Sequence, residues 1–151
     1  MSTEPDRRAT EGWAKPVQRL DVPGVEPGTT AINVAGKRPT SPTQGFGRMW
    51  QKTYRVRLAG ADMGPRELTD LWKERFGSFW PKKSRFFAPL AGIAPGEVAA
   101  LNVSMPGGLK LSTGVLVMYA DEESFTLMTP QGHMFAGWIT FSAFADADGV
   151  T

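Results

Sequence analysis

His133 is the single histidine of the chain and the side chain best suited to proton transfer near neutral pH. It lies in the stretch TPQGHMFAGWITFSAF, residues 129–144, among apolar, small and hydroxylic residues. An imidazole in an apolar cleft can act as a general acid or base with a shifted pKa. Such catalysis usually needs a carboxylate that orients the ring, and the nearest acids, residues 121–123, lie at the far end of the preceding hairpin. The pattern therefore favours a wall residue that bonds its own loop over a catalytic group.

Composition excludes several other chemistries. The chain has no cysteine, and so no disulfide, thiolate metal site or cysteine nucleophile. A single histidine rules out a multi-histidine metal centre, and the run DEES offers too few spaced oxygen ligands for calcium. The glycines of GFGR and GGLKLSTG match neither a dinucleotide fingerprint nor a phosphate loop. We therefore expect no metal and no cofactor.

Length and composition indicate one globular domain. The chain has 151 residues, of which 41% are hydrophobic and 21% are charged. Its net charge of +2 is too small to indicate a nucleic-acid partner. No apolar run reaches the ~18 residues of a membrane span, and the N-terminus MSTEPDRRATEG does not resemble a signal peptide. We expect a cytoplasmic protein that neither binds nucleic acid nor inserts stably into a membrane.

Residues 1–44 are rich in proline and glycine and show no sustained hydrophobic period. Within them, DVPGVEPGTT and GKRPTSPTQG are loop signatures. We expect a flexible N-terminal arm, either a mobile tail or an extended segment lying on the domain, with AINVAG as a short apolar element able to dock. The folded domain is then expected over residues 45–151.

The folded part is predicted to begin with a strand and a helix. In TYRVRL, residues 53–58, apolar and polar residues alternate, which is typical of a half-exposed strand. A helix is predicted over residues 65–78, with Pro65 at its first position and Gly77 near its end. One face of this helix carries an apolar stripe, formed by Leu68, Leu71, Trp72 and Phe76. Residues 80–97 are broken by proline and predict only short turns or one-turn helices.

The second half of the chain has the pattern of strands. Strands are predicted at residues 97–105, 115–120 and 125–129, and a long final strand at residues 133–144. Residues 106–114, PGGLKLSTG, are predicted to form a turn-rich connection. The order of strand, helix, broken segment and antiparallel meander predicts an α+β fold.

Three sequence blocks carry a resemblance to known proteins. GFGRMWQKTYRVRL, FWPKKSRFFAPLAGIAPGEVAALN and LSTGVLVMYADEESFTLMTPQGHMFAGWITFSAF resemble an uncharacterised actinobacterial family, itself similar to a domain-of-unknown-function group also found in plants. The layout resembles the START-like helix-grip superfamily of polyketide cyclases and carriers of lipids and other hydrophobic ligands. That resemblance implies a curved antiparallel sheet gripping one main helix. Helix-grip domains close with a long C-terminal helix, so the ending ADADGVT leads us to expect a truncated domain whose uncovered sheet promotes self-association.

The resemblance also implies a hydrophobic pocket between the helix and the sheet. Aromatic side chains provide broad contact faces, and methionines adapt to irregular shapes. The candidate ligand-binding residues are Trp72, Phe76, Phe86, Leu101, Met118, Met128, His133, Phe135 and Trp138. Taken one by one, the apolar members are equally typical of an ordinary core.

Three functions follow as alternatives. The first is a non-catalytic module that binds a hydrophobic small molecule or lipid. The second is a cyclase- or hydratase-type enzyme on the same scaffold, with His133 as its acid–base group. The third is a truncated remnant that acts through association with another protein. The missing orienting carboxylate counts against the enzyme, and the expected missing helix favours the third alternative.

Overall fold

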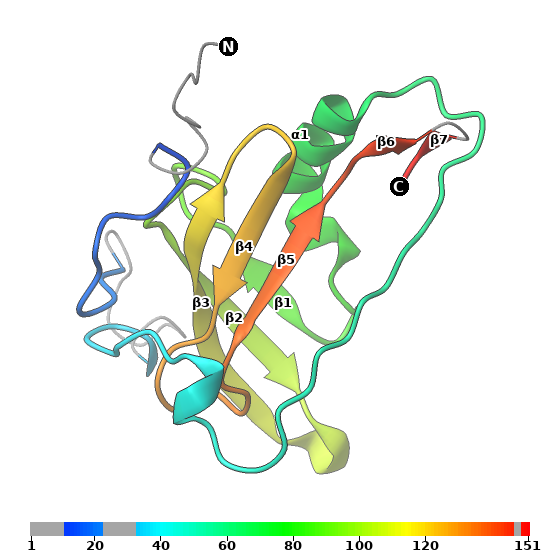
Figure 1. The fold of residues 1–151 in the computed structure, drawn as a ribbon. Coiled ribbons are helices and arrows are strands. Elements are labelled where there is room, and N and C mark those ends of the chain that lie inside the picture. The colour runs from blue at the N-terminus through cyan, green and yellow to red at the C-terminus, as the bar shows by residue number, and fades with distance from the viewer. Residues whose placement is uncertain (1–10, 23–32, 147–148) are drawn as a thin grey trace.

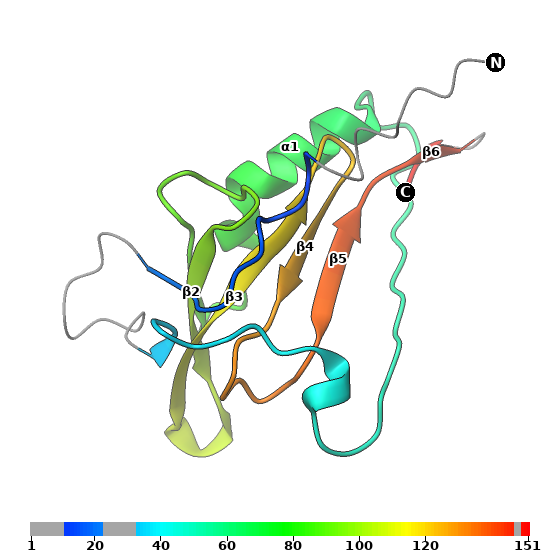
Figure 2. The ribbon, with the colours of Figure 1, turned by 60° about the vertical axis from the view of Figure 1, so that its left-hand side comes forward.

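The main feature of the fold is a five-stranded antiparallel sheet with one helix across a face. The computed structural model describes residues 11–22, 33–146 and 149–151 (Figure 1). The strands follow the order β1-β2-β3-β4-β5, and helix α1 lies against the sheet (Figures 1 and 2). The predicted α+β fold with an antiparallel meander is therefore confirmed.

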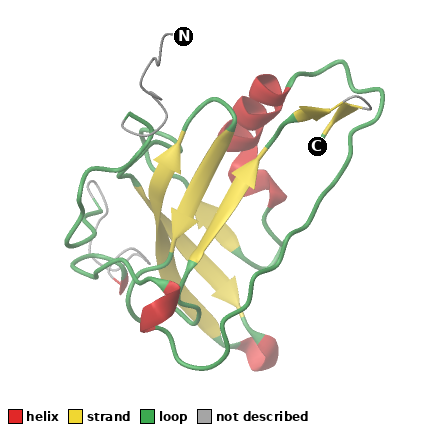
Figure 3. Cartoon of the chain, in the orientation of Figure 1, coloured by secondary structure: helices red, strands yellow, loops and turns green. Residues whose placement is uncertain are grey.

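The elements are short and are joined by long loops, drawn in green in Figure 3. The sheet is formed by β1 (Arg85–Phe87), β2 (Val98–Ser104), β3 (Lys110–Ala120), β4 (Ser124–Met128) and β5 (Trp138–Ser142). A second, two-stranded pairing joins β6 (Ala145–Asp146) to β7 (Gly149–Val150). The helical elements are η3 (Pro42–Gln44), α1 (Pro65–Arg75), η4 (Phe76–Phe79) and η5 (Pro106–Gly108).

Helix α1 begins where its sequence predicts. Pro65 takes the first helical position, and the Glu67 carboxylate accepts a hydrogen bond from the Gly64 N–H at 3.0 Å. The α-helix ends at Arg75, and η4 continues as a tighter turn through the rest of the predicted helical range. The buried side of this helical segment places Trp72 against the sheet.

The main core lies between α1 and the sheet. Successive side chains of a strand point to opposite faces, so alternate residues of β2, β3 and β4 reach the helix side. The buried members of this core are Phe76, Ile93, Ala99, Leu101, Val115, Val117, Phe125 and Leu127.

The opposite face of the sheet is covered by the N-terminal segment. Leu20 and Val34 are fully buried there, against Val98 and Leu116. A Cβ atom on Gly114 would lie 2.6 Å from Val34 Cγ2, so the close approach of this segment requires glycine at position 114. Packing therefore extends N-terminal of the expected boundary at residue 45. Of the predicted flexible arm, residues 1–10 and 23–32 lie outside the described residues.

The predicted strand at residues 53–58 is wrong. Residues 46–57 run as a drawn-out segment beside the sheet, and only Leu58 forms a β-bridge, to Val150 (Figure 1). Within the described ranges, no backbone hydrogen bond involves residues 46–57. Alternation identifies the side-chain pattern of a strand, but the ladder also needs a neighbouring backbone.

Three other boundaries differ from prediction. The final strand begins only at Trp138, because the Thr129 N–H donates to the Gly137 carbonyl at 3.0 Å and closes residues 130–136 into a loop. Strand β3 already begins at Lys110, because that residue pairs with Ser104 of β2. The proline-broken segment contains β1, which gains its partner from β2. Each difference depends on pairing between strands rather than on local pattern.

Candidate functional site

Four of the nine candidate ligand residues meet in the helix-side core. Trp72, Phe76 and Phe86 come from α1, η4 and β1, and Leu101 belongs to the same core. The Phe76 ring lies 4.9 Å from Phe86, with an edge-to-face geometry. These side chains form an aromatic layer between α1 and the sheet.

The other five candidates lie elsewhere. Met128 pairs with Leu116 and Trp138, which places it on the face opposite α1. Met118 lies where the β3–β4 register shifts. Phe135 and Trp138 are exposed, at 70% and 59%. The structure therefore divides the predicted set, with His133, in the loop before β5, apart from the aromatic layer.

The surface hollows lie away from the candidate ligand-binding residues. Two hollows have volumes of about 460 and 510 Å³. The first is mainly polar, with Asn33, Lys37 and Lys110 in its wall. The second lies beside Trp13 and Glu97. Neither is lined by any of the nine candidate residues, so neither supports the predicted hydrophobic site.

His133 bonds its own loop. The backbone N–H of Phe135 donates to Nδ1 of His133 at 3.0 Å, and the Phe135 carbonyl lies 3.0 Å from the same nitrogen. Burial lowers the pKa of His133, against the opposing effect of the Phe135 hydrogen bond, so the ring is neutral at pH 7. Among the described residues, no ion pair joins His133 to a carboxylate. The geometry lacks the oriented acid–base pair of a catalytic histidine.

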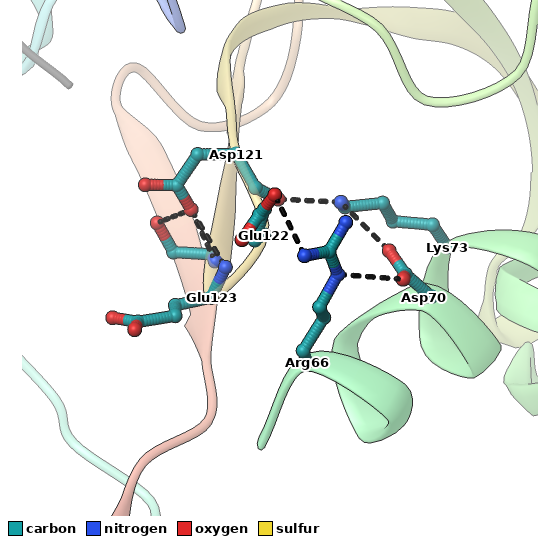
Figure 4. A network of polar contacts seen from close by, with 7 residues as sticks. Arg66, Asp70, Lys73, Asp121, Glu122 and Glu123 are labelled. Atoms are coloured by element: carbon teal, nitrogen blue, oxygen red, sulfur yellow. Dashed lines mark hydrogen bonds and ion pairs between the residues drawn. The ribbon is translucent and has the colours of Figure 1, made fainter. Parts of the chain in front are cut away.

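A polar network ties α1 to the β3–β4 hairpin (Figure 4). Arg66 Nη1 lies 2.9 Å from a Glu122 carboxylate oxygen, and Lys73 donates to the carbonyl of Asp121. Asp70 lies between the two bases on α1, 4.0 Å from Arg66 and 3.5 Å from Lys73. The helix spacing of these three residues is visible in the sequence. The contact with the hairpin arises only in the folded chain, and it holds α1 in place across the sheet.

Asp121 organises the tip of that hairpin. Its Oδ1 accepts hydrogen bonds from the backbone N–H groups of Glu123 and Ser124, at 2.8 and 2.7 Å. Its Oδ2 accepts one from the Tyr119 hydroxyl at 2.7 Å. Burial raises the pKa of Asp121, but these hydrogen bonds together outweigh it and hold the pKa below its ordinary value of 3.8. The sequence interpretation of DEES as a polar turn is confirmed, and Asp121 has a structural role there.

Replacing Asp121 by asparagine is expected to lower the free energy of unfolding by about 1–2 kcal/mol at pH 7, since hydrogen bonds to a partly exposed carboxylate are lost or weakened. The pKa of Asp121 is lower in the folded chain than in the unfolded chain. Its contribution is therefore present above pH 3.8 and is lost as the pH falls through the lower folded value. Urea unfolding between pH 2.5 and 7 measures this difference. Glu74→Gln removes an exposed carboxylate from α1 as a control, and an equal effect of both changes would contradict the expectation.

A second concentration of apolar side chains is exposed at one side of the sheet. The exposed large residues of the segment 46–57 and of β5 are Phe46, Met49, Trp50, Tyr54, Val56, Trp138 and Ile139. Tyr54 and Val56 are 84% and 71% exposed. Contiguous exposed apolar patches are rare on soluble domains, and where they occur they often mark interaction sites.

Comparisons with protein families, with curated proteins and with solved structures found no match for this chain. In the described ranges, no three histidine, aspartate or glutamate side chains lie together as metal ligands. No helix in the same part of the chain is long and apolar enough to cross a bilayer.

Proposed function

We propose that the chain is a non-catalytic binding module of the START-like helix-grip type, with a hydrophobic small molecule or lipid as its ligand. One observation carries this proposal: the aromatic layer under α1 is only partly enclosed. Around the buried Phe76, the rings of Trp72, Trp80, Phe86 and Phe141 are only partly buried. Rings of this kind offer a ligand apolar contact without large rearrangement of the core.

At the β5 edge of this layer, Trp72 and Phe141 are both partly buried. Trp72 and Phe141 make an edge-to-face contact with ring centroids 5.0 Å apart. Ile139 lies two residues from Phe141 on the same strand, so its side chain points to the same face. It is 52% exposed, which leaves an apolar rim beside the aromatic rings. A hydrophobic ligand that covers this rim gains about 25 cal/mol per Å² of apolar surface removed from water.

The enzyme alternative has less support. A neutral His133 bonded to its own loop is not oriented by any carboxylate in the described part of the chain. The proposal therefore assigns His133 to the loop structure, and His133→Gln is expected to leave ligand binding unchanged. Glutamine keeps a donor and an acceptor but removes the group that titrates near neutrality.

The test is a titration with the apolar fluorescent probe 1-anilinonaphthalene-8-sulfonate. Ile139→Asn is expected to weaken probe binding about tenfold, because it removes apolar surface on the helix-facing rim. Trp138→Asn is the matched control, since Trp138 is the neighbouring residue, is similarly exposed and points to the other face. An equal loss of probe affinity in both variants, or a greater loss in Trp138→Asn, would contradict a ligand site on the helix-facing side of β5.

The same titration between pH 5.5 and 8 separates the module from an enzyme. The wild type and His133→Gln are expected to give the same flat profile. A pH-dependent binding profile that disappears in His133→Gln would contradict the binding module. A separately measured enzymatic turnover that falls by ~10²–10⁴ in the same variant would establish the acid–base role instead.

A further inference from the structure

One edge of β5 offers backbone groups without a neighbouring strand along its length. Gly137 O and Ala143 N bond toward β4, which shows that the odd-numbered residues of this strand face β4. The backbone N–H and C=O groups of Trp138, Thr140 and Ser142 therefore point the other way. Within the described residues, no strand pairs with this edge of β5.

The position of β7 defines where a further strand can pair with this edge of β5. Phe144 and Thr151 exchange two backbone hydrogen bonds of 2.9 Å, so β7 lies on the outward side of the β5–β6 line. On its other side, the carbonyl of Val150 accepts a hydrogen bond from the Leu58 N–H at 2.9 Å. At this level β7 pairs antiparallel with both neighbours, and the segment 46–57 continues from Leu58 beside β5 (Figures 1 and 2).

The segment 46–57 is long enough to leave space for a strand. At its far end Gly45 lies against Ala136, because a Cβ atom on Gly45 would be 2.9 Å from Ala136 Cβ. Between these two contacts with the sheet, the chain advances by 13 residues from Gly45 to Leu58. Over the same distance, the chain that contains β5 advances by only 9 residues, from Ala136 to Ala145. At about 3.3 Å per residue, the segment is roughly 13 Å longer than the strand it accompanies, so it bows away from β5.

The pairing of β7 also fixes which face of the sheet the side chains of β5 and of residues 46–57 point to. Ala145, Val150 and Leu58 lie opposite one another across the ladders and therefore share a face. That face is the helix side, because Ala145 has the same parity as Phe141. Tyr54 is then directed to the helix side as well.

Over residues 54–58 basic and apolar side chains alternate, and so Arg55 and Arg57 point to the opposite face. The Arg57–Asp146 ion pair, at 2.9 Å, agrees with this assignment, because Asp146 is also on that face. Among the described residues, Arg55 has no ion-pair partner. Beside residues 54–57, a strand therefore meets the apolar side chains of Tyr54 and Val56 on one face and the positive charge of Arg55 on the other.

We propose that an extended segment of a partner polypeptide binds as a strand between β5 and residues 46–57, in the same direction as β7. The first residue of this partner strand beyond Thr151 lies opposite Val56. The second residue lies between Ser142 and Arg55, and the third lies between Phe141 and Tyr54. The partner chemistry follows from these neighbours. It carries apolar residues at the first and third positions and a carboxylate at the second.

A second copy of this chain fits the same place less well. The exposed extended segment that a second copy offers is residues 46–57, with Arg55 and Arg57 between its apolar residues. In this register, one of those arginines would lie opposite Arg55 of the first copy, and like charges directly opposite each other destabilise a strand pair. Charge complementarity therefore selects an acidic partner strand.

The test uses a labelled peptide, Val-Glu-Val-Thr-Val-Thr between short Gly-Ser flanks, titrated into the intact chain by fluorescence anisotropy up to ~1 mM. Binding is expected, and a peptide with lysine in place of glutamate is expected to bind at least tenfold more weakly. Hydrogen exchange should slow at least tenfold at the amides of Thr140, Ser142 and Val56. Absence of binding, or binding without this protection, would overturn the proposal.

Two proline variants test the edge itself. Val56→Pro removes an N–H that points toward β5 and is expected to weaken the peptide at least tenfold. Thr53→Pro is the control, because its N–H points away in the same exposed segment. Equal effects of the two variants would contradict the register. A wild-type dimer in sedimentation equilibrium that Val56→Pro dissociates would assign the edge to a second copy instead. Val56→Pro is expected to keep its affinity for 1-anilinonaphthalene-8-sulfonate. A loss of peptide binding in this variant then tests the strand proposal independently of the ligand proposal.

Discussion

Phe76→Ala is expected to lower the free energy of unfolding by about 3–5 kcal/mol, the usual loss for a fully buried phenylalanine. Phe76 is only 4% exposed and is the hub of the aromatic layer. Its ring centroid lies 4.9 Å from Phe86, 5.1 Å from Phe141 and 5.4 Å from Phe125. Because these neighbours come from separate strands, the cavity left by alanine cannot close without moving the sheet or α1.

Urea unfolding followed by circular dichroism measures this loss. Phe79→Ala is the matched control, since Phe79 lies three residues later in the same η4 turn and is 63% exposed. Its cost is expected to stay below about 1 kcal/mol. A loss below 1 kcal/mol for Phe76→Ala as well would show that the helix-side layer is not the core of the domain.

Leu20→Ala is expected to cost about 2–5 kcal/mol, although Leu20 lies in the segment that sequence alone assigns to a flexible arm. Its side chain is 1% exposed and packs with Val34, Val98 and Leu116 on the face opposite α1. The backbone holds it in place, because the Leu20 N–H donates to the Lys37 carbonyl at 2.7 Å. Removing three carbon atoms there opens a cavity between the segment and the sheet.

Val17→Ala provides the comparison, because Val17 is only partly buried at the rim of the same cluster. We expect a cost of about 1 kcal/mol or less for it. Equal stability of Leu20→Ala and the wild type would return the domain boundary to residue 45 and make the N-terminal segment dispensable for folding.

The local elements were readable from the sequence because each depends on neighbours in the chain. Helix α1 follows from Pro65, the Glu67 cap and the apolar spacing of Trp72 and Phe76. The polar turn at Asp121 likewise follows from side chains that bond backbone groups two and three residues away. Alternation along β2 and β4 was enough to predict an antiparallel meander.

Only the tertiary structure decided which of these elements meet. The same alternation that is real in β2 did not make a strand of residues 53–58, because pairing needs a second backbone at the right distance. Leu20 and the sheet, like Arg66 and Glu122, are far apart in sequence, and no local pattern encodes their contacts. The candidate ligand set divided for the same reason: apolar type predicts burial, whereas the face of the sheet on which a side chain lies is set by strand register.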